Sequence, residues 1–274
     1  MNLLRSLAII VAVTAVAVTA MLLVRRRAPE GSYFQDGDRA AGVFGVLATG
    51  FSVLLGFIIF LSFQAYDDTR AGAENEATVV AQMVQTAQLM PGGSSEELTG
   101  ELICYGRSVV GTEWDAVAEG RLQDSINPWG ARMFTTLAAL EPTTNSEQSA
   151  YDQWLQQSSD RQVARNARVH TAAGIIPVPL WLGLYLICAV IFGFMLFFAD
   201  SGEGAFTQAA LIGSVAVVIT VLMLLLGFFD HPHGEGLGGL RPAAMERALR
   251  VIDAQVAALD LSVDPPCDAE GTAR

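Results

Sequence analysis

The chain has 274 residues, of which 52% are hydrophobic and only 16% are charged. An ordinary soluble domain has roughly 25% charged residues, so much of this surface is expected to face lipid. The net charge of −12 argues against nucleic acid as a partner, because binding to phosphates needs a basic surface.

Four apolar stretches are each long enough to form a membrane-spanning helix. Such a helix needs about 20 mostly apolar residues, and helix is the form that satisfies its peptide groups inside lipid. The first stretch is interpreted as a retained anchor, since it exceeds the roughly 7–15 apolar residues of a signal-peptide core. The predicted transmembrane helices are residues 1–24, 40–64, 178–199 and 205–229.

The connections predict how these helices are paired. A polar linker, 25–39, joins the first two spans, and it contains Arg25, Arg26, Arg27 and Arg39. Only the short polar turn 200–204 separates the last two, which predicts an antiparallel helical hairpin.

Residues 65–172 are predicted to form a water-facing helical domain. This segment contains about fifteen acidic residues against seven arginines, and apolar residues recur in it at helical spacing. No proline interrupts the chain between Phe63 and Met90, so the second span should continue as a stalk into the domain. Since no strand-like alternation occurs, the fold class is an all-α membrane protein with four transmembrane helices and this domain between the second and third.

The C-terminal region is predicted to contain one more helix and a tail. Residues 230–260 include an amphipathic juxtamembrane pattern, and residues 261–274 have the composition of a disordered tail. Cys104, Cys188 and Cys267 lie far apart and show neither a metal-ligand spacing nor a disulfide framework.

No catalytic motif is present, so an enzyme is not expected, and no cofactor or metal site is predicted. The second span nevertheless has a face that could line a pore, at helical spacing: Phe57, Phe60, Gln64 and Asp67. Close helix packing is the favoured use of this face, because the span contains Gly42, Gly45, Gly50 and Gly56. His231 and His233 could bind a metal or sense pH, but polar residues at a helix end explain them more simply.

Arg161, Arg165 and Arg168 form a basic stripe approaching the third span. The stripe could attract anions or lipid phosphates. The favoured alternative is exposed salt bridges to acidic residues of the opposite stalk, with Glu74 and Glu76 at the height of Arg165 and Arg168.

The orientation in the membrane stays open at this stage. Short loops weigh most in the positive-inside rule, which favours a cytoplasmic Arg25–Arg27 linker and a domain outside. The domain's own juxtamembrane arginines favour the reverse.

The order of elements resembles the bacterial bestrophin-like membrane protein family of unknown function, over about Ala41 to Leu259. Individually weak motifs in a specific order carry the resemblance: Leu54-Leu55-Gly56-Phe57, Gln64-Ala65-Tyr66-Asp67-Asp68, Glu76-Ala77, Tyr105, Val109-Val110, Glu113-Trp114, Pro179-Leu180-Trp181 and Asp230-His231-Pro232 with Gly234 and Gly236. The candidate motif residues are Tyr66, Glu76, Glu113, Trp114, Pro179, Trp181, Asp230 and Pro232. His233 departs from the family pattern, which has Phe there.

The resemblance implies an architecture related to bestrophins, which are pentameric anion channels with cytosolic domains. Two functions follow as hypotheses. One is a homo-oligomeric anion channel in a bacterial inner membrane, with the second span nearest the pore. The other is a membrane-anchored scaffold or sensor whose helical domain binds a protein partner. Membrane lipid is an expected partner of both.

Overall fold

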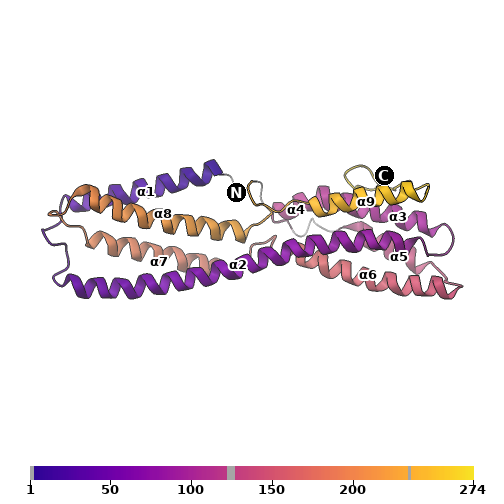
Figure 1. The fold of residues 1–274 in the computed structure, drawn as a ribbon, viewed down its shortest axis with the longest axis horizontal. Helices are drawn as coiled ribbons and strands as arrows, with labels where there is room; N and C mark the ends of the chain where they lie inside the picture. Colours follow the sequence, from indigo (N-terminus) through magenta and orange to yellow (C-terminus); the bar gives the residue numbers. More distant parts are fainter. Residues whose placement is uncertain (1–2, 122–126, 234–235) are drawn as a thin grey trace. The chain divides into compact units, whose positions relative to one another are not determined.

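The computed structural model describes residues 3–121, 127–233 and 236–274, so Gly234 lies outside the described residues (Figure 1). The described part is helical, with one isolated bridge between Cys267 and Ala273 and no strand. This confirms the all-α class. The elements are α1 (Leu3–Arg25), α2 (Gly37–Ala87), α3 (Ser94–Ser108), the π-helical turn η1 (Val109–Glu113), α4 (Trp114–Ala118), α5 (Pro128–Ala138), α6 (Asn145–Val169), α7 (Val178–Phe197), α8 (Ala205–Asp230) and α9 (Ala243–Ala258).

Four of these helices, α1, α2, α7 and α8, are long and apolar enough to cross a membrane, as predicted. Helix α2 has 51 residues, which correspond to about 75 Å at 1.5 Å per residue. That length exceeds a hydrocarbon core of roughly 30 Å. The second span therefore belongs to one unbroken helix that is longer than a single membrane crossing requires.

The chain divides into two compact units. The membrane unit comprises Met1–Ala65, Gly174–Asp230 and Glu235–Gly238, and the helical unit comprises Tyr66–Ala173, His231–Gly234 and Gly239–Arg274.

The core of the membrane unit lies where α2, α7 and α8 meet. Its buried side chains are apolar and come from all three helices: Phe51, Leu55, Ile58, Leu184, Ile191, Ile219 and Leu226. Helix α1 packs along α8 (Figure 1), where Gly213 faces Val18 and Thr14. A small residue at such a crossing lets two membrane helices approach closely.

The α1–α2 linker and the α7–α8 turn meet at one end of the membrane unit. The Arg25 guanidinium donates to the backbone carbonyls of Ser201 at 3.1 Å and Glu203. The backbone N–H of Gly31 donates to Asp200 Oδ1 at 3.0 Å. These contacts place both connections on the same side of the membrane.

The core of the helical unit confirms the predicted apolar stripes. Buried members come from α2, α3, α5, α6 and α9 and include Val80, Met83, Val84, Leu98, Leu102, Tyr105, Trp129, Met133, Trp154, Met245 and Ile252. Helices α2 and α6 cross at Gly72, where a Cβ would lie 2.7 Å from the backbone N of Arg168. A larger residue at position 72 would therefore force these two helices apart.

Local capping explains where two helices of the helical unit begin. Asn127 accepts a hydrogen bond from the N–H of Trp129 at 3.2 Å, and Pro128 occupies the first turn of α5. Thr144 and Glu147 form a capping box at the start of α6. Each cap satisfies backbone groups that the helix itself leaves unpaired.

The C-terminal segment, residues 261–274, differs from the predicted disordered tail. Its Cys267 is buried and forms a disulfide with Cys104 of α3, and Trp129 Nε1 donates to the carbonyl of Gly271 at 2.7 Å. The interpretation of the cysteines was therefore wrong as well. Proline, glycine and charge in a short segment suggest disorder, but they do not reveal a binding surface that distant helices supply.

Candidate functional site

The exposed face of α2 carries the pore-lining candidates. Phe57 and Phe60 are 60% and 54% exposed, and Gln64 is also exposed. The opposite face of the same helix is buried, with Leu55 only 1% exposed. Two large aromatic side chains and one amide thus lie on a face that the membrane unit itself leaves uncovered.

Four glycines in the apolar part of α2 do not pack against any other described residue. A Cβ built at Gly42, Gly45, Gly50 or Gly56 would meet no atom within 4 Å among the described residues. The close packing that the sequence suggested is therefore absent from the described part of a single copy. The glycine positions remain available to a neighbouring molecule.

Asp67, the fourth pore-lining candidate, belongs to the helical unit and is exposed there. The following residue, Asp68, lines an open groove between α2 and α6. The groove also presents Asn75 of α2, Asn166 of α6 and His170.

Two motif candidates meet at Asp230, the last residue of α8. Its Oδ1 accepts hydrogen bonds from the N–H groups of Ile175 and Ile176, both at 2.7 Å, and its Oδ2 accepts one from Trp181 Nε1 at 3.1 Å. Pro179 occupies the first turn of α7 in the same region of the chain. The buried carboxylate of Asp230 therefore holds the start of α7 next to the end of α8.

Three other motif candidates meet in the helical unit around Arg168. Its guanidinium pairs with Glu76 of α2 through two contacts and with Glu113 of η1, where Nη2 lies 2.7 Å from Oε1. Arg168 lies 5.8 Å over the ring of Trp114 and is 1% exposed. We call Glu76, Glu113, Arg165 and Arg168 the ion cluster.

The π-helical turn positions one carboxylate of the ion cluster. Gly111 has a non-helical conformation inside it, at φ −97° and ψ −107°, and the turn carries Glu113 at its end. Single π-turns inside helices frequently occur at functional sites. Here the turn delivers Glu113 to Arg168 and also to Arg165, whose Nε lies 2.9 Å away.

Neighbouring side chains complete the hydrogen bonding of the ion cluster. The Tyr105 hydroxyl donates to Glu76, and Asn127 Nδ2 donates to Glu113 Oε2 at 3.1 Å. Burial, with the Glu76 carboxylate next in weight, raises the pKa of Tyr105. Burial alone would lower the pKa of Arg168, but the carboxylates of Glu76 and Glu113 raise it above its usual value. The hydroxyl and the guanidinium therefore both keep their protons, and the two carboxylates are matched by two arginines.

The structure corrects the expected environment of the basic stripe. Arg168 does pair with Glu76, but the pair is buried rather than exposed. Arg165 pairs with Glu113, while Glu74 pairs with Arg70 on its own helix. Arg161 is also buried and lies 4.5 Å over the ring of Tyr105. Sequence spacing placed the arginines on one face but could not show that α3 and η1 cover it.

The two histidines after α8 have different environments. His231 is exposed, whereas His233 is buried, with its ring 5.5 Å from that of Trp114. Burial and then the nearby Arg168 lower the pKa of His233 to about 4. The expectation of simple polar residues at a helix end is thus wrong for His233, which is a buried, neutral ring beside Trp114.

Tyr66 and Pro232, the remaining motif candidates, lie elsewhere. Tyr66 is half-buried on α2. Pro232 is buried, and its carbonyl accepts a hydrogen bond from the N–H of Leu240 at 2.9 Å.

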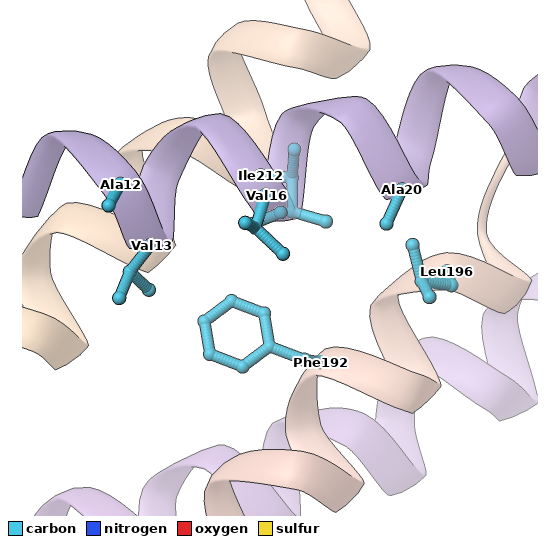
Figure 2. A pocket seen from close by; sticks show the side chains of 8 residues that line it. Ala12, Val13, Val16, Ala20, Phe192, Leu196 and Ile212 are labelled. Atoms are coloured by element: carbon cyan, nitrogen blue, oxygen red, sulfur yellow. The ribbon is translucent and has the colours of Figure 1, made fainter.

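The membrane unit also contains an apolar pocket of about 360 Å³ between α1, α7 and α8 (Figure 2). Figure 2 shows the Phe192 ring pointing into it from α7, below Val13 and Val16 of α1. A site for an ion or a cofactor needs polar groups that converge on it. The lining has none: Ala12, Val13, Val16, Ala17, Ala20, Phe192, Leu196 and Ile212.

Sequence reasoning missed two features of the helical unit. Tyr105 and Asn127 join the ion cluster, and Cys104 pairs with Cys267. Asn127-Pro128 is a local pattern typical of a helix start, but nothing local connects it with Glu113. The cysteines are 163 residues apart, a separation at which sequence alone carries no pairing signal.

Comparisons with known proteins identify relatives with the same architecture. A family model described as the Bestrophin-like domain matches residues 11–236. Crystal structures of two point variants of a bacterial Bestrophin homolog from Klebsiella pneumoniae are similar to this chain. One has a TM-score of 0.68 and 13% identity, covering 93% of this chain and 98% of that one. The other has a TM-score of 0.67 and 11% identity, covering 92% and 98%.

A third crystal structure, of a point variant described only as a membrane protein, has a TM-score of 0.67 and 12% identity, with 89% and 97% covered. None of the curated proteins matches the chain. At such low identity the structural matches show a shared fold, the bestrophin fold. Because the family model covers most of the sequence, from the first span to the exit of α8, the chain belongs to the Bestrophin-like family.

Proposed function

We propose that this membrane protein is a homo-oligomeric, anion-selective channel of the bacterial inner membrane, with α2 nearest the pore. Family membership and the likeness to bacterial bestrophin homologues support this proposal. The observation that carries it is the uncovered face of α2 with Phe57, Phe60 and Gln64.

Gln64 argues for water rather than lipid on this face. An amide side chain in hydrocarbon leaves donors and acceptors unsatisfied, which is unfavourable. If copies of the chain surround a pore, Gln64 faces water or a neighbouring subunit, and the cost is avoided. The uncovered glycines of the same helix would let neighbouring copies approach closely.

The aromatic residues are compatible with anions in the pore. The edge of a phenyl ring has positive electrostatic potential, and its face has negative potential. Rings of Phe57 and Phe60 edges from several subunits would favour an anion without any charged side chain in the span. Asp67 is the first charged residue of α2 after these rings, so it would influence the ions that approach from that end.

The test uses purified full-length protein in nanodiscs and in planar bilayers. We expect a ring of several copies by native mass measurement, and currents that chloride or nitrate carries in preference to sodium. A monomer, or bilayers silent for chloride, nitrate and cations under all conditions, would overturn the proposal.

Matched variants test whether α2 lines the pore. Phe57→Ala with Phe60→Ala should alter conductance or selectivity. Phe206→Ala, which removes another exposed ring from the start of α8, should leave both unchanged. Asp67→Asn should increase the preference for anions. Equal responses of the α2 and α8 variants would remove α2 from the pore.

The alternative functions gain no support. If the protein were a scaffold or sensor, we would expect a monomer or dimer with a reproducible protein partner. No observation on the described residues favours such a partner. No enzymatic activity is proposed, because the buried carboxylates Glu76 and Glu113 are already paired with arginines.

A further inference from the structure

The C-terminal segment 261–274 has a built binding surface on the helical unit. Both cysteines of the Cys104–Cys267 disulfide are fully buried, with Cα atoms 5.8 Å apart. Arg107 Nη1 donates to the carbonyl of Asp268 at 3.1 Å, and Gly271 lies so close to Ser108 that no Cβ would fit there. These contacts, with the Trp129–Gly271 hydrogen bond, position Cys267 against α3.

A disulfide between these two cysteines indicates in which cellular compartment the helical unit lies. Forming it removes two protons and two electrons from the thiols of Cys104 and Cys267. The electrons pass to a thiol–disulfide oxidant, such as the disulfide of an oxidoreductase, which is reduced to a dithiol. Such oxidants maintain disulfides outside the cytoplasm, whereas cytoplasmic reductants keep thiols reduced.

The arginines provide an independent indication of sidedness. The short stretch 25–39, from the last residue of α1 to the first turn of α2, contains four arginines, and its contacts with the α7–α8 turn place both connections on one side of the membrane. Short arginine-rich connections stay in the cytoplasm, while long segments are translocated largely regardless of their charge. Helix α2, which is long and apolar enough to cross the membrane, connects this linker with the helical unit.

From these two observations we infer that the helical unit and its disulfide-closed C-terminal segment lie on the extracytoplasmic side of the membrane. This orientation is opposite to the cytosolic domain that the resemblance to bestrophins implies. It does not depend on channel activity, so it can be tested separately from the proposed function.

The first experiment counts thiols in living cells. Cells expressing the Cys188→Ala variant, which retains only the pair, are quenched in acid and denatured, and thiols are labelled with polyethylene-glycol maleimide. We expect no adduct before reduction and two adducts after it. Two adducts without reduction would overturn the inference. The Cys104→Ser, Cys188→Ala double variant should show one adduct in both conditions.

The second experiment determines sidedness without the disulfide. In a background lacking all three native cysteines, Ser159→Cys marks an exposed position on α6 and Ser201→Cys an exposed position in the α7–α8 turn. A membrane-impermeant maleimide applied to spheroplasts should label position 159 directly and position 201 only after permeabilisation. The reverse pattern would overturn the inference, even if the protein conducts ions.

If the cysteine-free background fails to accumulate, the same two positions are examined with Cys104 and Cys267 retained and Cys188→Ala. The disulfide-bonded pair does not react with maleimide, so labelling still reports the introduced cysteine. If the native pair itself is labelled in spheroplasts before reduction, the disulfide is absent and the inference fails.

Discussion

The membrane unit and the helical unit are both bundles of helices, but different interactions hold their helices together. In the membrane unit, apolar side chains meet between α2, α7 and α8, and Asp230 accepts three hydrogen bonds from backbone and indole N–H groups. The helical unit adds the ion cluster and a disulfide to its apolar core.

This difference has a physical reason. Lipid tails are as apolar as the side chains that they surround, so burial in lipid provides little driving force between helices, and close packing with hydrogen bonds must specify the arrangement. In water the apolar core itself drives folding. The buried charges of the helical unit are then held in place by that core, and they demand correct partners because an unpaired buried charge is strongly unfavourable.

The largest expected effect comes from breaking the ion cluster. Arg168→Met leaves Glu76 and Glu113 buried without their shared partner, and should lower the free energy of unfolding of the helical unit by about 3–5 kcal/mol. Denaturant titration followed by the fluorescence of Trp114, Trp129 and Trp154 measures this. Arg70→Met is the control, because the exposed Arg70–Glu74 pair contributes only about 0–1 kcal/mol. Similar midpoints for the two variants would show that burial of the cluster has no energetic consequence.

The disulfide comes next. Replacing both Cys104 and Cys267 with alanine should destabilise the helical unit by about 2–5 kcal/mol, since the cross-link restricts the unfolded chain. Thermal unfolding in detergent, with and without reductant, reports the loss. Cys188→Ala, in the membrane unit, should retain the wild-type response to reductant. A wild-type protein that reductant does not affect would contradict this expectation.

A smaller effect is expected in the membrane unit. Asp230→Ala removes the acceptor for the N–H groups of Ile175 and Ile176 and should cost about 1–3 kcal/mol, the penalty for leaving buried donors unpaired. Asp230→Asn keeps one acceptor oxygen and should cost less. Trp181 donates to Asp230, so a red shift of its emission would locate the change; identical spectra for the alanine variant and the wild type would argue against this role.

The smallest effect depends on pH. The pKa of His233 is lowered to about 4 in the folded protein, against about 6.5 when unfolded. The unfolded state therefore binds the proton first, and this contribution to stability is complete above pH ~6.5 and is lost as the pH falls toward ~4. At pH 5 the loss should be about 1–2 kcal/mol.

His233→Phe should remove this part of the pH dependence, whereas His170→Gln, at an exposed position, should retain it. Unfolding midpoints of the three proteins at about pH 7.5 and about pH 5 provide the comparison. A phenylalanine variant as sensitive to acid as the wild type would assign the effect to the carboxylates instead.

Much of the architecture could be predicted because its signals are local. The apolar lengths of α1, α7 and α8, and the proline-free run through α2, each lie within one stretch of sequence. The same holds for the helical stripes of α3 and α5. The order of short motifs led to the correct family, which the family model confirms.

The candidate sites were only partly predictable, because they depend on which elements come together. Spacing placed Arg165 and Arg168 on one helical face, but Glu113 reaches them from a π-helical turn that no sequence pattern indicated. His233 looked like a polar residue at a helix end, and its burial against Trp114 comes from a helix more than a hundred positions away in the sequence.

By itself, the sequence determined four membrane-capable helices and an all-α fold; the water-facing position of the segment between the second and third spans stays a prediction. These follow from hydrophobicity and periodicity, which are properties of single segments. Only the tertiary structure decided that Arg161 and Arg168 of the arginine stripe are buried, that Cys267 meets Cys104 and that Phe57 and Phe60 remain uncovered. Burial and pairing are relations between distant segments, and a linear pattern contains no information on which of its faces another helix will cover.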